Sequence, residues 1–292
     1  TPNLDRLARE GTRLTQFYVH AVCSPTRAAF LTGRYPFRTG MEERSHGNDV
    51  AGMLTDERTL AGALKEAGYF TAIIGKWHLG NWHKRHLPMQ RGFDYQYGLY
   101  GALISYYGKT RDRYYDWHRN EQVLREEGYS TDLIGRECVR VIASHEAKKP
   151  IFLYVPFNAV HGPDEAPPEL GKKYQAIVER QAGDLSPSKQ RFLTLKYAML
   201  ESMDLAIGAI LDSLKAKGEL DNTLIVFFND NGGRNENLPY RGGKGDTFEG
   251  GVRVPCIVRW PGRVPANRSV DGMMHVVDLF PTLLKQGQAP LE

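Results

Sequence analysis

The chain has 292 residues, of which 41% are hydrophobic and 25% charged, a composition that supports a substantial core and excludes a disordered protein. The net charge is only +4, with no long run of one sign, so nothing indicates nucleic-acid binding, and no apolar run is long enough to span a membrane. The three cysteines include no Cys-x-x-Cys pair, so we expect neither a disulfide framework nor a zinc-thiolate site, and we expect Cys138 and Cys256 to be buried.

Hydrophobic spacing predicts helices and strands that alternate along the chain. In chain order these are a helix near residues 4–8, a strand at 12–22, a helix at 57–67, a strand at 69–74, a helix at 131–147, a strand at 151–157, a helix at 189–217, strands at 223–228 and 254–260, and a helix at 275–285. The nearly continuous apolar runs at 151–157 and 223–228 are typical of strands buried on both faces. Residues 81–120 show little periodicity and predict a long irregular segment. The pattern favours an α/β fold with a largely parallel central sheet flanked by helices.

The stretch CSPTRAAFLTGR, which begins at Cys23, predicts a loop that turns into a short helix. Ser24 is a suitable N-cap, Pro25 suits the first helical position, and Gly33 suits the helix end. Cys23 then lies just outside a helix N-terminus with Arg27 one turn along. The helix dipole and the guanidinium both favour an anion there, either a thiolate or a bound oxyanion. Taken alone, the string is equally consistent with a buried cysteine before a helix.

Polar clusters follow three of the predicted strands directly. They are Lys76 with His78, then His161, then Asp230 with Asn231. Because sites in open α/β sheets form beyond the carboxyl ends of the strands, we expect these clusters to converge with Cys23 on one pocket. A carboxylate beside an amide carbonyl suits calcium or magnesium, and a histidine exchanges protons near neutral pH. The simpler interpretations are an Asn-Gly-Gly turn, a surface Lys-Trp-His turn and a structural histidine.

These motifs together resemble the sulfatase family. Its Cys-x-Pro-x-Arg core with a Leu-Thr-Gly-Arg tail is followed in family order by GKWHLG at residues 75–80, DNGG at 230–233, RGGKG around Lys244 and EGGVRVP from Glu249. The resemblance extends from TPNLD at residue 1 to DLFPTLL at 278–284. It implies an alkaline-phosphatase-like sandwich and a single catalytic domain over residues 1–292. The activity implied is hydrolysis of aryl or carbohydrate sulfate monoesters.

The resemblance also implies a role for each site residue. Cys23 would be oxidised to Cα-formylglycine by a maturation enzyme, and with Asp230 and Asn231 it would hold Ca²⁺, with Mg²⁺ as the alternative. Lys76, His161 and Lys244 would bind the sulfate oxygens, and Arg27 would favour the ionised oxygen of residue 23. The proton roles are assigned to His161 or Lys244 for the leaving alcohol and to His78 for the release of sulfate. For Lys244 the simpler interpretation is a solvated lysine in a flexible loop.

The substrate side is indicated by a basic and aromatic segment that follows the Lys76 motif. Its members are His83, Lys84, Arg85, His86, Tyr106, Tyr107, Arg111 and Arg113, with His83 as the candidate substrate contact. They can line an entrance for an anionic or sugar-like substrate, or form a solvated basic loop. Residues 75–94 are most similar to arylsulfatases of the B type, which act on sulfated amino sugars.

Two features of the family are not found in this sequence. Family members usually begin with a strand that ends in paired aspartates, which are two further metal ligands, and they carry a smaller C-terminal subdomain. We therefore expect a domain truncated at both ends. The alternatives to a sulfatase are a phosphate or phosphonate ester hydrolase of the same superfamily and an inactive fragment that binds sulfated glycans. The family expectation for location is the periplasm, the cell exterior or a lysosome-like compartment.

Overall fold

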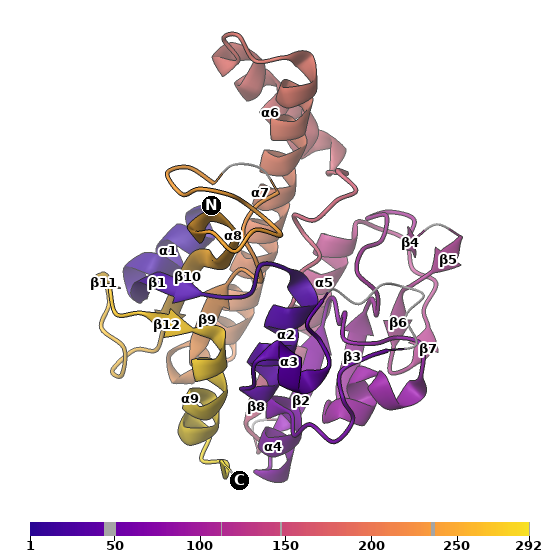
Figure 1. The fold of residues 1–292 in the computed structure, drawn as a ribbon, viewed down its shortest axis with the longest axis vertical. Helices are drawn as coiled ribbons and strands as arrows, with labels where there is room; N and C mark the ends of the chain where they lie inside the picture. The colour runs from indigo at the N-terminus through magenta and orange to yellow at the C-terminus, as the bar shows by residue number, and fades with distance from the viewer. Residues whose placement is uncertain (44–50, 112, 147, 235–236, 292) are drawn as a thin grey trace.

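Two five-stranded sheets form the centre of the protein in a computed structural model that describes residues 1–43, 51–111, 113–146, 148–234 and 237–291 (Figure 1). The first sheet has the order β11 (Arg268–Val270), β1 (Thr12–Tyr18), β10 (Arg253–Arg259), β9 (Ile225–Phe228), with β12 (Met274–His275) also beside β1. The second has the order β7 (Gln122–Val123), β6 (His118–Arg119), β3 (Tyr95–Gly98), β2 (Phe70–Ile74), β8 (Ile151–Tyr154). A hairpin of β4 (Thr110–Arg111) and β5 (Tyr114–Tyr115) accompanies them.

Helices surround these sheets, and Figure 1 shows α2 and α3 in front of them with α6 and the start of α7 projecting from the body. The α-helices are α1 (Pro2–Glu10), α2 (Cys23–Thr32), α3 (Pro36–Thr39), α4 (Leu60–Glu66), α5 (Ser130–Ser144), α6 (Pro168–Gln181), α7 (Pro187–Ala216), α8 (Glu249–Val252) and α9 (Leu279–Gln286). The 3₁₀ turns are η1 (Lys84–His86), η2 (Pro88–Arg91), η3 (Leu220–Asn222) and η4 (Val276–Asp278). The α/β fold predicted from the sequence is confirmed.

The directions of the strands differ between the two sheets. Strands β3, β2 and β8 run parallel, as predicted for a largely parallel sheet, but β9, which precedes Asp230, has only an antiparallel neighbour among the described strands. Strand β10 is antiparallel to both β1 and β9, and β6 is antiparallel to β3 and β7. The chain between β9 and β10 contains only the short helix α8 among its described residues, so it returns as an antiparallel neighbour without a full helical crossover.

Most predicted elements are present, with shifted ends. The helix predicted at 131–147 is α5, which ends at Ser144, and residue 147 lies outside the described residues. The strand predicted at 12–22 ends at Tyr18. The helix predicted to begin at His275 begins at Leu279, because residues 274–275 pair with β1 first. Cys138 and Cys256 are free and buried, as predicted.

The expectation that β8 and β9 are buried on both faces is wrong. Every residue of both strands is only partly buried, since each is the last strand of its sheet. Helix α2 lies across both of these strands: the Phe30 ring packs 5.2 Å from the Tyr154 ring of β8 and 5.4 Å from the Phe228 ring of β9, centroid to centroid. The continuous apolar runs were correctly identified as strands, but burial also depends on a neighbour at each edge.

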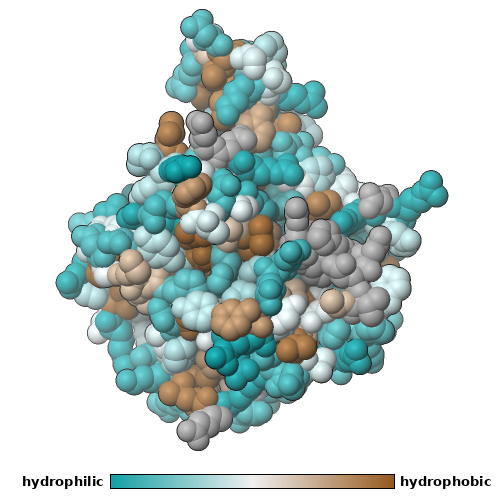
Figure 2. Space-filling model, in the orientation of Figure 1, coloured by the Kyte–Doolittle hydropathy of each residue, from teal (hydrophilic) through white to brown (hydrophobic). Residues whose placement is uncertain are grey.

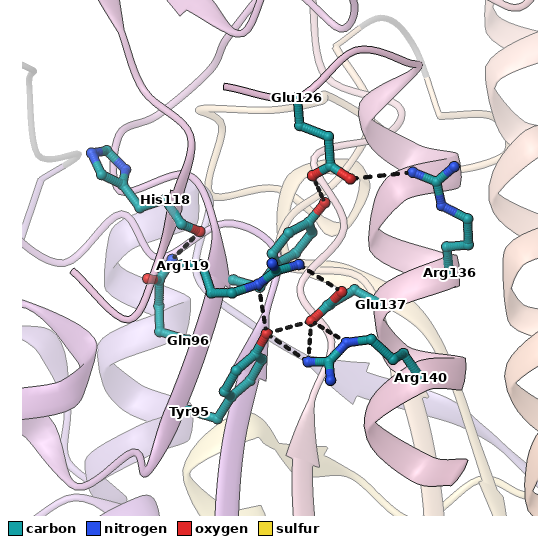
Figure 3. Close-up of polar contacts among 9 residues, drawn as sticks. Tyr95, Gln96, His118, Arg119, Glu126, Arg136, Glu137 and Arg140 are labelled. Atoms are coloured by element: carbon teal, nitrogen blue, oxygen red, sulfur yellow. Dashed lines mark hydrogen bonds and ion pairs between the residues drawn. The ribbon is translucent and has the colours of Figure 1, made fainter. Parts of the chain in front are cut away.

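A polar network joins the second sheet to α5 (Figure 3). The Glu137 carboxylate accepts hydrogen bonds from the Tyr95 hydroxyl, from Arg140 Nη2 at 2.6 Å and from Arg119 Nη2 at 3.1 Å. Burial by itself raises the pKa of Glu137, but the bonds from Arg140 and Tyr95 hold it below its usual range. The network fixes β3 against α5 and thereby supports the neighbouring strand β2.

Hydrophilic side chains cover most of the face drawn in Figure 2. Apolar side chains lie among them, including on the projecting end. Helix α7 is the longest described helix, with 30 residues, and it carries three lysines, two aspartates and one glutamate along its length. Among the described residues, no helix combines the length and apolar character that crossing a membrane requires.

Candidate active site

Cys23 is the first residue of α2, and the whole of this helix is buried. The predicted N-cap is wrong: Val22, in an extended conformation, caps the helix, and the Ser24 hydroxyl instead donates to the His78 carbonyl oxygen at 2.9 Å. Gly33 ends the helix in the left-handed region at φ 66°, as predicted. Only 4% of Cys23 is exposed, so its thiol lies beneath the surface at the positive end of a helix.

Arg27 links three segments that are far apart in the sequence. Its Nε and Nη2 lie 3.0 and 2.7 Å from Asp230 Oδ2, and its Nη1 donates to the Lys76 carbonyl oxygen at 2.8 Å. Burial alone raises the pKa of Asp230, but the charges of Arg27 and Lys76 outweigh it and hold this pKa well below its usual range. Asp230 is therefore an anion that orients Arg27 beneath Cys23.

Two donors lie against the Cys23 thiol. Asn231 Nδ2 and Lys244 Nζ are each 3.4 Å from Cys23 Sγ. The loop that carries Lys244 is tied to the segment before α2, because the Gly245 N–H donates to the Ala21 carbonyl oxygen at 2.9 Å. The loop position of Lys244 therefore depends on the same segment that positions Cys23, and the simpler interpretation of a solvated lysine is wrong.

Lys76 follows β2 and is 98% buried, with only 2% of the residue exposed. The chain turns sharply before it: Gly75 has φ 136°, and a Cβ there would overlap the Pro156 carbonyl oxygen. Burial and the charge of Arg27 lower the pKa of Lys76 to about 8, although Cys23 and Asp230 oppose this. A buried ammonium with a lowered pKa is suited to an incoming anion.

His161 lies at the end of the segment that follows β8. Its Nδ1 is 2.8 Å from the Gly162 carbonyl oxygen, and the Tyr106 hydroxyl contacts the His161 carbonyl oxygen at 2.8 Å. Burial and the charges of Lys76 and Lys244 lower the pKa of His161 to about 4. The ring is therefore neutral near pH 7, and since a carbonyl only accepts, Nδ1 carries the proton and Nε2 does not.

His78 and His83 have a less direct connection with the centre. His78 is 3% exposed, has φ 62°, and its carbonyl oxygen accepts the Ser24 hydroxyl. The His83 ring contacts His86, with centroids 6.0 Å apart, and no hydrogen bond or ion pair between described residues joins His83 to the Cys23 centre. The roles given to both histidines stay predictions. Tyr106 is fully buried and does not line an entrance.

Few side chains among the described residues could serve as ligands for a divalent cation. Asp230 and Asn231 offer three side-chain oxygens, two from the carboxylate and one from the amide. Both Asp230 oxygens are already engaged, Oδ2 by Arg27 and Oδ1 by Asn231 Nδ2 at 2.5 Å. No group of three or more His, Cys, Asp or Glu that could hold a metal occurs in the described ranges. Since calcium takes six to eight oxygen ligands, these residues do not form a complete cation site.

A cavity of about 500 Å³ borders His161. Its walls include Ser105, Thr110, Arg111, His161, Gly162 and Arg234. Arg111 belongs to the basic segment predicted to line an entrance, whereas Arg234 was not predicted as a site residue. The available signal was its position directly after the DNGG string, where the chain leaves the strand-end cluster.

A buried cysteine at a helix N-terminus lies near Arg27 of the same helix, Lys244 of a loop, and Lys76 and His161, which follow two strands. This arrangement defines an α/β protein with a positively charged centre. The family model described as Sulfatase matches residues 1–289. The chain belongs to the sulfatase family.

Two curated relatives illustrate the range of similarity. Arylsulfatase J of Mus musculus is 33% identical over 305 residues, which cover 100% of this chain and 49% of that protein. N-acetylgalactosamine-6-sulfatase of Homo sapiens is 33% identical over 314 residues, which cover 97% of this chain and 56% of that protein. The chain thus spans about half the length of these relatives.

Solved structures show the same similarity in three dimensions. The structure of Ps i-CgsB in complex with k-i-k-neocarrahexaose superposes with a TM-score of 0.89 at 32% identity, covering 100% of this chain and 67% of that chain. The PsFucS1 sulfatase from Pseudoalteromonas sp. gives 0.81 at 31% identity, covering 99% and 62%. Phosphonate monoester hydrolase of Agrobacterium radiobacter, with 0.70 at 21% identity, covering 99% and 69%, shares the fold. The alkaline-phosphatase-like architecture predicted from the sequence is confirmed.

Proposed function

We propose that this protein hydrolyses sulfate monoesters of aryl or carbohydrate alcohols at the Cys23 centre. The observation that carries the proposal is the placement of Cys23 Sγ, buried at the start of α2 and 3.4 Å from both Lys244 Nζ and Asn231 Nδ2. Arg27, Lys76 and Lys244 add positive charge around it, which suits a sulfate ester with its anionic oxygens. Sequence similarity to named sulfatases supports the same assignment.

Residue 23 is proposed to act after oxidation to Cα-formylglycine by a maturation enzyme, which would be a partner of this chain. The Sγ atom marks where the oxygen of the modified side chain would lie. Formylglycine supplies, as a hydrated aldehyde, one oxygen for attack on sulfur and a second hydroxyl for release of sulfate. A thiol has no second hydroxyl for that release, which is the physical reason for the modification.

The basic side chains are proposed to bind and stabilise the reacting sulfate. Lys76 and Lys244 would hold its oxygens as charge shifts during transfer, and each well-placed donor contributes about 3 kcal/mol. Neutral His161 has no proton on Nε2, so Lys244 is the better placed group to protonate the leaving alcohol. His78 is assigned the proton that leaves the second hydroxyl when sulfate is released.

The proposed cation is Ca²⁺, with Mg²⁺ as the alternative, and Asp230 and Asn231 would be its ligands from this chain. These residues alone do not complete a site, so no catalytic step is assigned to the metal. We propose that residues 1–292 belong to one catalytic domain. We also propose, from the family resemblance, that the protein works outside the cytosol.

The test compares esters that differ only in the group transferred, with the full-length protein made together with the maturation enzyme. We expect p-nitrophenyl sulfate to be hydrolysed with a higher kcat/KM than p-nitrophenyl phosphate or a phosphonate monoester, because the centre is built around a monoanionic ester. The Cys23→Ala variant should lose this turnover. Preference for phosphate would overturn the proposal in favour of a phosphate or phosphonate hydrolase, and binding of sulfated glycans without turnover would favour an inactive binding protein.

A further inference from the structure

Two arginines from separate segments line the cavity beside His161. Arg111 ends β4 and is half-buried, whereas Arg234 follows the turn after β9 and is exposed. Arg234 Nη1 would lie 3.4 Å from a Cβ placed at Gly162, and its charge is among those that lower the pKa of His161. Both residues line the cavity that His161 also borders.

The acidic side chains next to this cavity are engaged elsewhere. Asp164 Oδ1 accepts from Lys196 Nζ at 2.7 Å, although it also lies 3.7 Å from the same Cβ position at Gly162. Glu165 accepts from the Ser105 hydroxyl at 3.1 Å and, through the same Oε2, from the backbone N–H of residue 106 at 2.6 Å. Asp164 forms an ion pair with Lys196. No ion pair joins Asp164 or another described residue to Arg234. Arg234 therefore adds positive charge at the wall of the cavity.

The walls of the cavity are held in place by these same contacts. Glu165 connects the segment at 105–106 with the segment that carries His161, and Lys196 of α7 donates to both Asp164 and the Val160 carbonyl oxygen at 2.7 Å. The volume of about 500 Å³ is in the range of pockets for small organic ligands and accommodates a sugar unit. The cavity is thus a formed site adjoining the reacting centre.

We propose that Arg111 and Arg234 bind a second anionic group of the substrate, so that the preferred substrate is a glycan with another sulfate or a carboxylate near the sulfate ester that is hydrolysed. This inference rests on the proposed function, because it places the reacting sulfate between Lys76 and Lys244, whose charges act on His161 at the wall of the cavity. Guanidinium groups recognise such oxyanions through two parallel hydrogen bonds, which lysine cannot reproduce. A simple aryl sulfate carries no group that reaches these arginines.

The kinetic test uses three disaccharides: one with a single sulfate ester, one with a second sulfate, and one with a uronate carboxylate beside the ester. For the full-length protein we expect kcat/KM to be higher for one or both dianionic compounds than for the monosulfate. In Arg111→Gln and Arg234→Gln we expect this preference to fall roughly 10- to 100-fold, mainly through KM. Arg234→Lys should recover only part of it. Comparing the disaccharide that has a second sulfate with the one that has a carboxylate identifies which oxyanion the arginines bind.

A binding measurement separates this inference from the proposed function. Calorimetry with the Cys23→Ala variant compares the same disaccharides without turnover, and the Arg111→Gln/Arg234→Gln double variant in that background should lose the preference for a second anion. Arg268→Gln, an exposed arginine on β11, is the matched control and should keep it. Equal binding of all three disaccharides by the parent, or an unchanged preference in the double variant, would overturn the inference even if aryl sulfates are hydrolysed. Absence of sulfatase turnover with the preference intact would overturn only the proposed function.

Discussion

Replacing Lys244 by alanine is expected to lower kcat/KM for p-nitrophenyl sulfate roughly 100- to 1000-fold. Lys244 Nζ lies 3.4 Å from Cys23 Sγ, which puts its charge next to the position of the attacking oxygen and the sulfate it meets. Removing an interaction that strengthens as charge develops on the sulfate lowers kcat. Removing an interaction that binds the ground state equally well changes only KM. Steady-state kinetics over a range of substrate concentration separates the two effects.

Two further variants make this result specific. Lys244→Arg keeps the charge and should recover part of kcat, which a loss of folding would not allow. Lys285→Ala removes an exposed lysine from α9 and should leave both kinetic constants unchanged. A kcat/KM for Lys244→Ala that stays close to that of the parent protein would remove Lys244 from the reaction.

Arg27→Met is expected to lower the free energy of unfolding by about 3 kcal/mol, near the lower end of the cost of breaking a buried ion pair. Methionine fills a similar volume but leaves Asp230 without its main partner and the Lys76 carbonyl oxygen without its donor. The Asp230 side chain is 27% exposed and still lies near Lys76, so the full cost of a buried charge is not reached. Denaturant unfolding measures the change.

The matched comparison uses an arginine whose ion pair is more exposed. Arg136 pairs with Glu126 at 3.3 Å (Figure 3). Because 69% of the Arg136 side chain is exposed, Arg136→Met should cost less than about 1 kcal/mol. The double variant Arg27→Met/Asp230→Asn should be more stable than Arg27→Met alone, because the unpaired carboxylate is gone. Equal destabilisation by Arg27→Met and Arg136→Met would show that the Arg27–Asp230 pair has no special structural role.

The convergence of the site was predictable because the ends of apolar runs are visible in a sequence. Lys76 and Asp230 follow strands directly, and the rule that sites form beyond strand ends brought them together with Cys23 correctly. The roles of side chains that depend on distant partners were harder to predict from the sequence. Ser24 satisfies the local pattern of an N-cap, but the His78 carbonyl oxygen, 54 positions along the chain, takes its hydroxyl.

Burial and loop geometry account for the remaining differences. The runs at β8 and β9 looked like fully buried strands, yet their burial depends on which strands lie beside them, and a sequence does not show which strand ends a sheet. Arg234 lies in a loop without periodicity, so only the folded chain places it beside His161. The protonation of His161 likewise follows from its burial near Lys76 and Lys244, which no local pattern reports.

The chemical state of residue 23 tests the central claim most directly. Peptide mass analysis of the full-length protein made with the maturation enzyme should show the Cys23 peptide lighter by about 18 Da, the change from cysteine to formylglycine. Sulfate-ester turnover across preparations should rise in proportion to the converted fraction. Full turnover by a preparation in which Cys23 remains entirely a thiol would contradict the account.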